Sequence, residues 1–86
     1  MKDSSQPLSR LPVGTRARIA SYLSNDAAFR RFREMGMLPG SEIRIVRLAP
    51  LGDPIEITVG ASLLSLRREQ AEMIAVIPEQ ESVTRP

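Results

Sequence analysis

Apolar and polar residues alternate along several short segments of the chain. Two such segments, 16–22 and 42–48, each follow a turn in which proline stands shortly before glycine, Leu11-Pro12-Val13-Gly14-Thr15 and Leu38-Pro39-Gly40-Ser41. Alternation with a period of two is typical of a strand that is buried on one face. In the second turn proline and glycine take the two central positions of a type II turn. Both segments are therefore predicted to be strands entered through tight turns.

The second of these strands carries an irregularity. Its apolar positions fall at Ile43 and Ile45 and then at Val46 and Leu48, so the inward phase shifts by one residue. A β-bulge produces such a shift, because one extra residue turns the following side chains to the other face. We expect a bulge between Ile45 and Val46, as in a tightly coiled small barrel.

The C-terminal half predicts a hairpin, a short helix and a last strand. Residues 54–59 alternate, Gly60 follows, and 62–66 is another short apolar run. Residues 67–73 contain helix formers over about two turns, and the β-branched run 74–77 ends at a proline. The last strand is expected to close the barrel.

A short amphipathic helix is predicted at residues 27–35, between the first two strands. Ser24, Asn25 and Asp26 offer N-caps, and Gly36 can end the helix in the left-handed conformation. A rotation of about 100° per residue separates two faces. The expected buried side holds Phe29, Phe32, Ala28 and Met35, the exposed side holds Arg30, Arg31 and Glu34, and Arg33 lies at the border.

These elements predict a mainly β protein. The economical arrangement is a small SH3-like barrel of about five antiparallel strands, with a short inserted α-helix and a second short helix before the last strand. The barrel is expected to occupy residues 8–78. Residues 1–7 and 79–86 are polar and without periodicity, so we expect disordered tails there.

The composition removes most catalytic and metal chemistry from consideration. The chain has no histidine and no cysteine, and its only lysine is Lys2. The usual general bases, nucleophiles and soft metal ligands are thus missing, and a P-loop is excluded. Glu69 and Glu72 read as solvating charges. No apolar run approaches the roughly 20 residues that span a bilayer, and no signal peptide is evident. We expect a cytoplasmic protein without a cofactor, a metal site or enzymatic activity.

Charge is distributed unevenly. Residues 1–50 hold nine Lys/Arg against four Asp/Glu, whereas residues 51–86 hold three against six. With a pI near 9.9, this leaves a nucleic-acid-binding barrel open as an alternative. Only Tyr22, Phe29 and Phe32 are aromatic, and the two phenylalanines are expected to be buried. Exposed stacking platforms for single strands and an aromatic groove for proline-rich peptides are therefore not expected.

Three segments resemble the FeoA family, the small ferrous-iron transport protein A. They are 31–40 (Arg-Phe-Arg-Glu-Met-Gly-Met-Leu-Pro-Gly), 49–55 and 66–71, and the resemblance covers about residues 8–78 in order and spacing. Phe32 stands where the family's leucine is expected. The resemblance implies an SH3-like barrel in the bacterial cytosol that associates with FeoB, the membrane ferrous-iron transporter. The same pattern occurs in the C-terminal domain of iron-dependent repressors, which keeps a repressor-associated module open as an alternative.

Five residues are the candidates for partner contact. Leu51 and Asp53 lie in the turn-rich segment 50–54, where Leu51 has no obvious core to enter. Arg30, Arg31 and Glu34 form the exposed helix face, while the aliphatic part of the Arg33 side chain is expected to pack along the edge of the core. The competing interpretation is structural: Asp53 as an Asx-turn former and the arginines as plain solvation. We expect an adaptor that acts through this surface, and an iron carrier or enzyme is the least favoured hypothesis.

Overall fold

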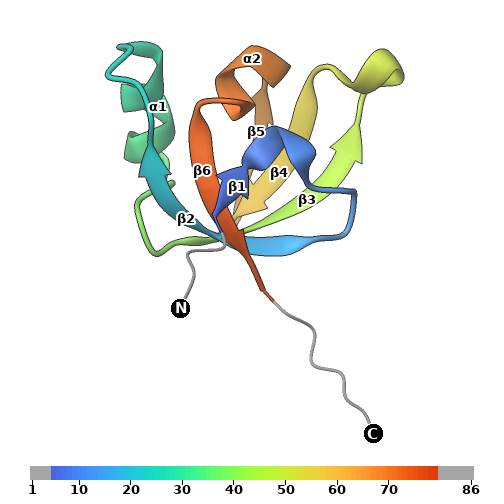
Figure 1. Cartoon of the computed structure of the whole chain (residues 1–86), viewed down its shortest axis with the longest axis horizontal. Helices are drawn as coiled ribbons and strands as arrows, with labels where there is room; N and C mark the ends of the chain where they lie inside the picture. The colour runs from blue at the N-terminus through green and yellow to red at the C-terminus, as the bar shows by residue number, and fades with distance from the viewer. Residues whose placement is uncertain (1–4, 80–86) are drawn as a thin grey trace, which may run out of the picture.

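The computed structural model describes residues 5–79, which form one coiled antiparallel sheet with short helices at one end (Figure 1). The strand order is β1-β6-β2-β3-β4-β5. The strands are β1 (Gln6–Pro7), β2 (Arg16–Tyr22), β3 (Glu42–Leu48), β4 (Ile55–Val59), β5 (Ser62–Leu66) and β6 (Ile74–Pro78). The helices are α1 (Ala28–Glu34) and α2 (Arg68–Ala71), and 3-10 turns are η1 (Leu8–Arg10) and η2 (Pro50–Gly52). The predicted mainly β architecture with an inserted helix is confirmed.

The described residues form six strands where about five were expected. The additional strand, β1, pairs Gln6 with Val76 and Pro7 with Ala75 on the outer edge of β6. The sequence places both residues in the expected N-terminal tail, because a two-residue strand has no periodicity to detect. Proline suits an edge strand, where its missing N–H removes no ladder bond. Residues 1–4 and 80–86 of the expected tails lie outside the described residues.

The tight turns and the bulge occur where the sequence predicted them. The Ser41 N–H donates to the Leu38 carbonyl at 2.8 Å, and Gly40 has a φ of 93°. The pairing of β3 with β4 shifts register between Ile45 and Arg47, which makes Val46 the extra residue. Val46 and Leu48 remain 36% exposed, so the expectation that both point into the core is wrong. Beyond Arg44, strand β3 has no further pairing partner on β2, and residues 46–48 are all exposed.

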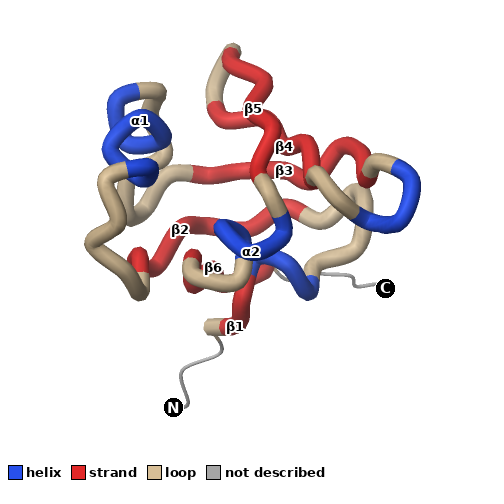
Figure 2. Tube along the Cα trace, turned by 90° about the horizontal axis from the view of Figure 1, so that it is seen from above, coloured by secondary structure: helices blue, strands red, loops and turns tan. Residues whose placement is uncertain are grey.

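The core lies inside the curled sheet, which Figure 2 shows from above with α2 near the middle and α1 at one side. Strands β2 to β6 each contribute alternate side chains, and η1 adds Leu8. The fully buried large residues are Leu8, Met37, Ile43, Ile45, Ile55, Ile57, Leu66, Ile74 and Val76. No polar or charged residue is buried among the described residues. The core is mostly aliphatic, and its strand-borne part follows the residue-by-residue alternation of the sequence.

Helix α1 begins and ends as its sequence predicts. The N-cap position is Ala27, and the Asp26 carboxylate before it accepts a hydrogen bond from the Ala28 N–H at 2.9 Å, so one of the three expected residues satisfies a free N–H of the first turn. At the other end the Met37 N–H donates to the Phe32 carbonyl and the Gly36 N–H to the Arg33 carbonyl, both at 3.0 Å. These two bonds define a Schellman motif, and Gly36 takes the left-handed position with a φ of 104°.

A small aromatic cluster fixes α1 to the barrel. Phe29 and Phe32 are buried, and the Phe29 ring lies 5.2 Å from that of Tyr22. The Tyr22 hydroxyl donates to the Met37 carbonyl at 2.7 Å, and the Arg33 guanidinium lies 4.5 Å from the centre of the Tyr22 ring. Arg33 therefore packs along the core edge, as expected.

Two residues expected on the buried side of α1 are exposed instead. Ala28 is exposed and Met35 is 38% exposed. The helix has only seven residues and contacts the barrel through its Phe29–Phe32 edge, so the flanking positions face a hollow toward β5. A helical wheel cannot indicate how wide the covered stripe of so short a helix is.

Candidate partner-binding surface

The segment between β3 and β4 presents a single leucine to solvent. The Gly52 N–H donates to the Ala49 carbonyl at 2.8 Å, which closes a four-residue turn with Pro50 and Leu51 at its centre. Leu51 has φ 72° and ψ 8°, the angles of the third position of a type II turn, where glycine is normally found. Its side chain is 101% exposed. A large apolar residue thus stands in a backbone conformation that costs about 1–2 kcal/mol for an L-residue.

Arg68 holds this turn in place. From the first turn of α2, its Nε donates to the Gly52 carbonyl and its Nη1 to the Ser9 carbonyl, each at 3.1 Å. One guanidinium therefore joins η1, η2 and α2, which are far apart in the sequence. The turn that carries Leu51 is held to the surface, because one charged hydrogen bond from Arg68 restrains Gly52, the residue next to Leu51, and a second ties Arg68 to η1.

Asp53 has a structural role in this arrangement. Its Oδ1 accepts a hydrogen bond from the Arg68 backbone N–H at 3.0 Å. The carboxylate therefore caps the start of α2 and ties the turn to the same residue that clamps Gly52. This contact explains Asp53 without a partner, and it favours the structural interpretation that the sequence left open for this residue.

The charged candidates on α1 face solvent. Arg30, Arg31 and Glu34 are all exposed, and none of them forms an ion pair with another described residue. Arg31 also borders an open hollow of about 420 Å³ between α1 and β5, with Met35 and the exposed Leu63 on its walls. The outer side of α1 thus combines two cations with an apolar flank.

The two groups of candidate residues, one on the η2 turn and one on α1, lie at the same end of the barrel but on opposite sides of it. In Figure 1, α1 and the η2 turn stand on either side of α2 at the top of the molecule, and Figure 2 shows the same order from above. Leu51 and Asp53 belong to one side, and Arg30, Arg31 and Glu34 to the other. A partner that contacts both groups must extend across α2.

Within residues 5–79 no three His, Cys, Asp or Glu side chains come together in a group that could hold a metal ion. No helix in this part of the chain is long and apolar enough to cross a membrane. The arrangement offers surfaces and turns for contact with another molecule.

Sequence reasoning missed the role of Arg68. The residue lies in the family-like segment 66–71, but its two acceptors are 16 and 59 residues away. Only the excess of arginine over lysine hinted at a bidentate contact.

The fold and the surface define a small SH3-like barrel with an inserted helix and a clamped apolar turn. The chain belongs to the FeoA family, because the model of the FeoA domain matches residues 6–78. FeoA proteins take part in ferrous-iron transport, and the family is a small, transport-associated domain.

Two solved FeoA structures illustrate the likeness. The FeoA protein from Chlorobium tepidum is 37% identical, with a TM-score of 0.84 over 91% of this chain and 74% of that one. FeoA from Stenotrophomonas maltophilia, crystallised with zinc and described as an SH3 domain protein, is 38% identical, with a TM-score of 0.70 over 80% of this chain and 86% of that one.

A longer relative carries the domain together with a transporter. The fusion protein of Fe(2+) transport protein A and the Fe(2+) transporter FeoB from Porphyromonas gingivalis is 38% identical over 69 residues, which are 80% of this chain. The matched part is 8% of that protein's length. In that protein the two domains are parts of one polypeptide.

Proposed function

We propose that this chain is a non-catalytic cytoplasmic adaptor that binds the cytosolic part of a FeoB-type ferrous-iron transporter and so lies at the inner membrane through its partner. The fusion of a related domain to FeoB supports this pairing, because fused domains commonly act on one another. Iron is the cargo of the transporter in this proposal and does not bind to the barrel.

The observation that carries the proposal is Leu51. A fully exposed leucine in a disfavoured backbone conformation has a cost without a benefit to the isolated fold. The Arg68 clamp holds the residue in place before binding, so little conformational entropy is lost when a partner covers it. Burial of one leucine side chain stabilises a complex by about 1.5–3 kcal/mol.

Arg30, Arg31 and Glu34 form the second contact area in this proposal. Two arginines on a short helix, neither in an ion pair with another described residue, favour an acidic partner surface and mainly raise the association rate. Asp53 contributes by holding the turn. The nucleic-acid alternative uses the same arginines but gives no role to Leu51.

The test is the affinity for the purified cytosolic region of a FeoB-type transporter. Leu51→Ala keeps the left-handed backbone and removes only the isobutyl group, so we expect at least about tenfold weaker binding with unchanged folding. Reversal of Arg30 and Arg31 to Glu is expected to weaken binding more at low than at moderate salt. Arg10→Glu, an exposed charge on η1, is the matched control.

Unaltered affinity of the Leu51→Ala and the doubly reversed proteins would refute this surface. Binding of generic duplex DNA that falls steeply with salt, together with no transporter binding, would favour the nucleic-acid alternative.

A further inference from the structure

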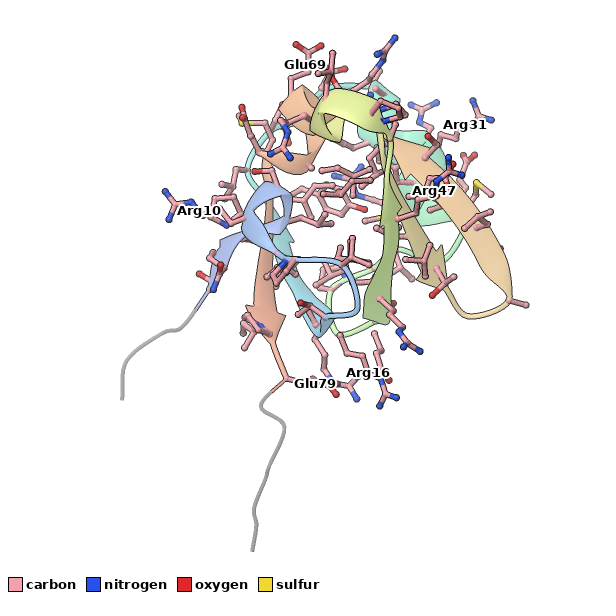
Figure 3. All side chains as sticks on the ribbon, turned by 90° about the vertical axis from the view of Figure 1, so that its right-hand side faces the viewer. Arg10, Arg16, Arg31, Arg47, Glu69 and Glu79 are labelled. Atoms are coloured by element: carbon pink, nitrogen blue, oxygen red, sulfur yellow. The ribbon has the colours of Figure 1, made fainter. Side chains whose placement is uncertain are left out.

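A second feature of the molecule lies away from the proposed partner surface. Arg16 on β2 is directly opposite Arg44 on β3, and Arg44 is directly opposite Thr58 on β4. Directly opposite side chains on neighbouring strands lie on the same face, with Cβ atoms about 5 Å apart. The side chains of Arg16 and Arg44 therefore project from the same face of the sheet at neighbouring positions. Figure 3 shows Arg16 next to Glu79, at the end of the barrel away from Glu69 and Arg31.

The carboxylates near this pair do not neutralise it. Glu79 lies 3.4 Å from Arg18, and Glu56 lies 3.9 Å from Arg47. Glu42, two residues before Arg44, is opposite Arg18 and forms no ion pair with another described residue. Like charges in directly opposite positions destabilise a sheet. The fold therefore keeps two adjacent cations at a cost, and the two nearby carboxylates, Glu42 and the Arg18-paired Glu79, offset their charge only in part.

An open hollow of about 640 Å³ adjoins the pair. Arg16 and Arg44 border it together with the hydroxyl-bearing residues Thr58 and Ser62. Gly36 and Gly60 also line it, so no side chain from either position fills the space. Guanidinium and hydroxyl groups are donors that suit carboxylate and phosphate oxygens.

We propose that this hollow is an oxyanion-binding site that takes a carboxylate or phosphate group between Arg16 and Arg44, with hydroxyl donors from Thr58 and Ser62. The bound anion removes the repulsion between the two cations. The Glu42 carboxylate, on the same wall, opposes anion binding and limits its strength. Met35 and Gly36, at the C-terminal end of α1, border the hollow, but none of the five residues proposed for the transporter contact lines it, so the site does not depend on that contact.

The test is a titration of the isotopically labelled chain followed by NMR. Inorganic phosphate and succinate are the two oxyanion probes, and chloride at matched ionic strength is the control for screening. We expect saturable shifts of the Arg16 and Arg44 side-chain signals with phosphate, with succinate or with both. The probe that saturates identifies the group that is bound. Shifts that chloride reproduces would overturn the proposal.

Variants on the same face sharpen the test. Arg16→Gln and Arg44→Gln are expected to weaken binding at least about fivefold each, because each removes a charged donor. Glu42→Gln is expected to strengthen it, since it removes a neighbouring negative charge. Arg47→Gln, on the same strand but paired with Glu56, is the matched control. Equal affinity in all four variants would contradict a site at these residues.

Thermal unfolding at low ionic strength provides an independent readout. Arg44→Gln is expected to raise Tm by about 1–8 °C, because it relieves the repulsion. Phosphate or succinate is expected to raise the Tm of the unchanged chain more than that of the variant. A lower Tm for Arg44→Gln would mean that the arginine serves the fold, and would overturn the proposal.

Discussion

Replacing Leu51 separates what this residue costs the fold from what it contributes to binding. Its backbone has a φ of 72°, and its side chain is fully exposed, so a smaller residue loses no packing. An L-residue in this conformation is disfavoured by about 1–2 kcal/mol, whereas glycine is not. Glycine also lowers the stability of the fold by about 0.5–1 kcal/mol, because it gives the unfolded chain greater conformational freedom. Leu51→Gly is therefore expected to exceed Leu51→Ala in stability by about 0.5–1 kcal/mol.

The comparison of these two variants isolates the backbone contribution, since neither has the isobutyl group. Urea denaturation followed by far-ultraviolet circular dichroism measures the free energy of unfolding, and an unchanged slope with denaturant shows that both unfold alike. The expected gain corresponds to a Tm about 2–8 °C higher for the glycine variant. Both variants are expected to bind the transporter region equally weakly.

A glycine variant that is less stable than the alanine variant would refute the reasoning, because it would mean that the turn does not strain Leu51. A glycine variant that keeps full transporter affinity would show that the leucine side chain is not a contact.

Three further predictions concern the supports of the fold and of the turn. Gly36→Val is expected to lower the stability of the fold by at least about 1 kcal/mol, and Gly36→Ala by about 1–2 kcal/mol, because φ is 104° at this position. The cost comes from the backbone, since a Cβ would meet Val59 Cγ1 at an ordinary 3.7 Å. Gly60→Ala, at φ 58° in open space, is expected to cost less, and Gly36 variants with an unchanged Tm would contradict the cap. Tyr22→Phe is expected to cost about 0.5–1.5 kcal/mol through the lost bond to Met37. Burial raises the pKa of Tyr22 and the Arg33 charge opposes the shift, so this contribution is complete below the ordinary tyrosine pKa of about 10 and is lost as pH rises through the folded-state pKa. Above pH 10, the Tm of Tyr22→Phe should fall less steeply with pH than the Tm of the unchanged chain. Parallel curves of Tm against pH would contradict this. Arg68→Met is expected to speed hydrogen exchange at the Gly52 amide and to weaken transporter binding, and unchanged exchange would show that the turn needs no clamp.

The features that sequence reasoning predicted well are encoded within a few residues. The turn at Leu38–Ser41, the Schellman motif at Gly36 and the bulge at Val46 each depend on local backbone angles or on the period of the side chains. Leu51 is expected at an exposed turn because it stands between turn-forming residues and has no obvious core to enter. Such features need no knowledge of the rest of the chain.

The features that sequence reasoning missed depend on contacts between residues far apart in the sequence. The two-residue β1 is a strand only because the edge of β6 is available to Gln6 and Pro7. Met35 is exposed because the barrel covers only one edge of α1. Arg68 contacts the Ser9 carbonyl across 59 positions, and nothing near either residue indicates the other.

The sequence by itself determined the fold class, the turns and the exposed side of α1, because hydrophobic period and turn chemistry act locally. The family followed from the resemblance of three segments to FeoA proteins. Tertiary structure alone decided that Asp53 caps α2, that Arg68 clamps the turn of Leu51, and that Arg16 and Arg44 stand side by side. The physical reason is register. Which side chains meet across a sheet, and which carbonyl a long side chain can reach, depends on how strands distant in the sequence align once the core has formed.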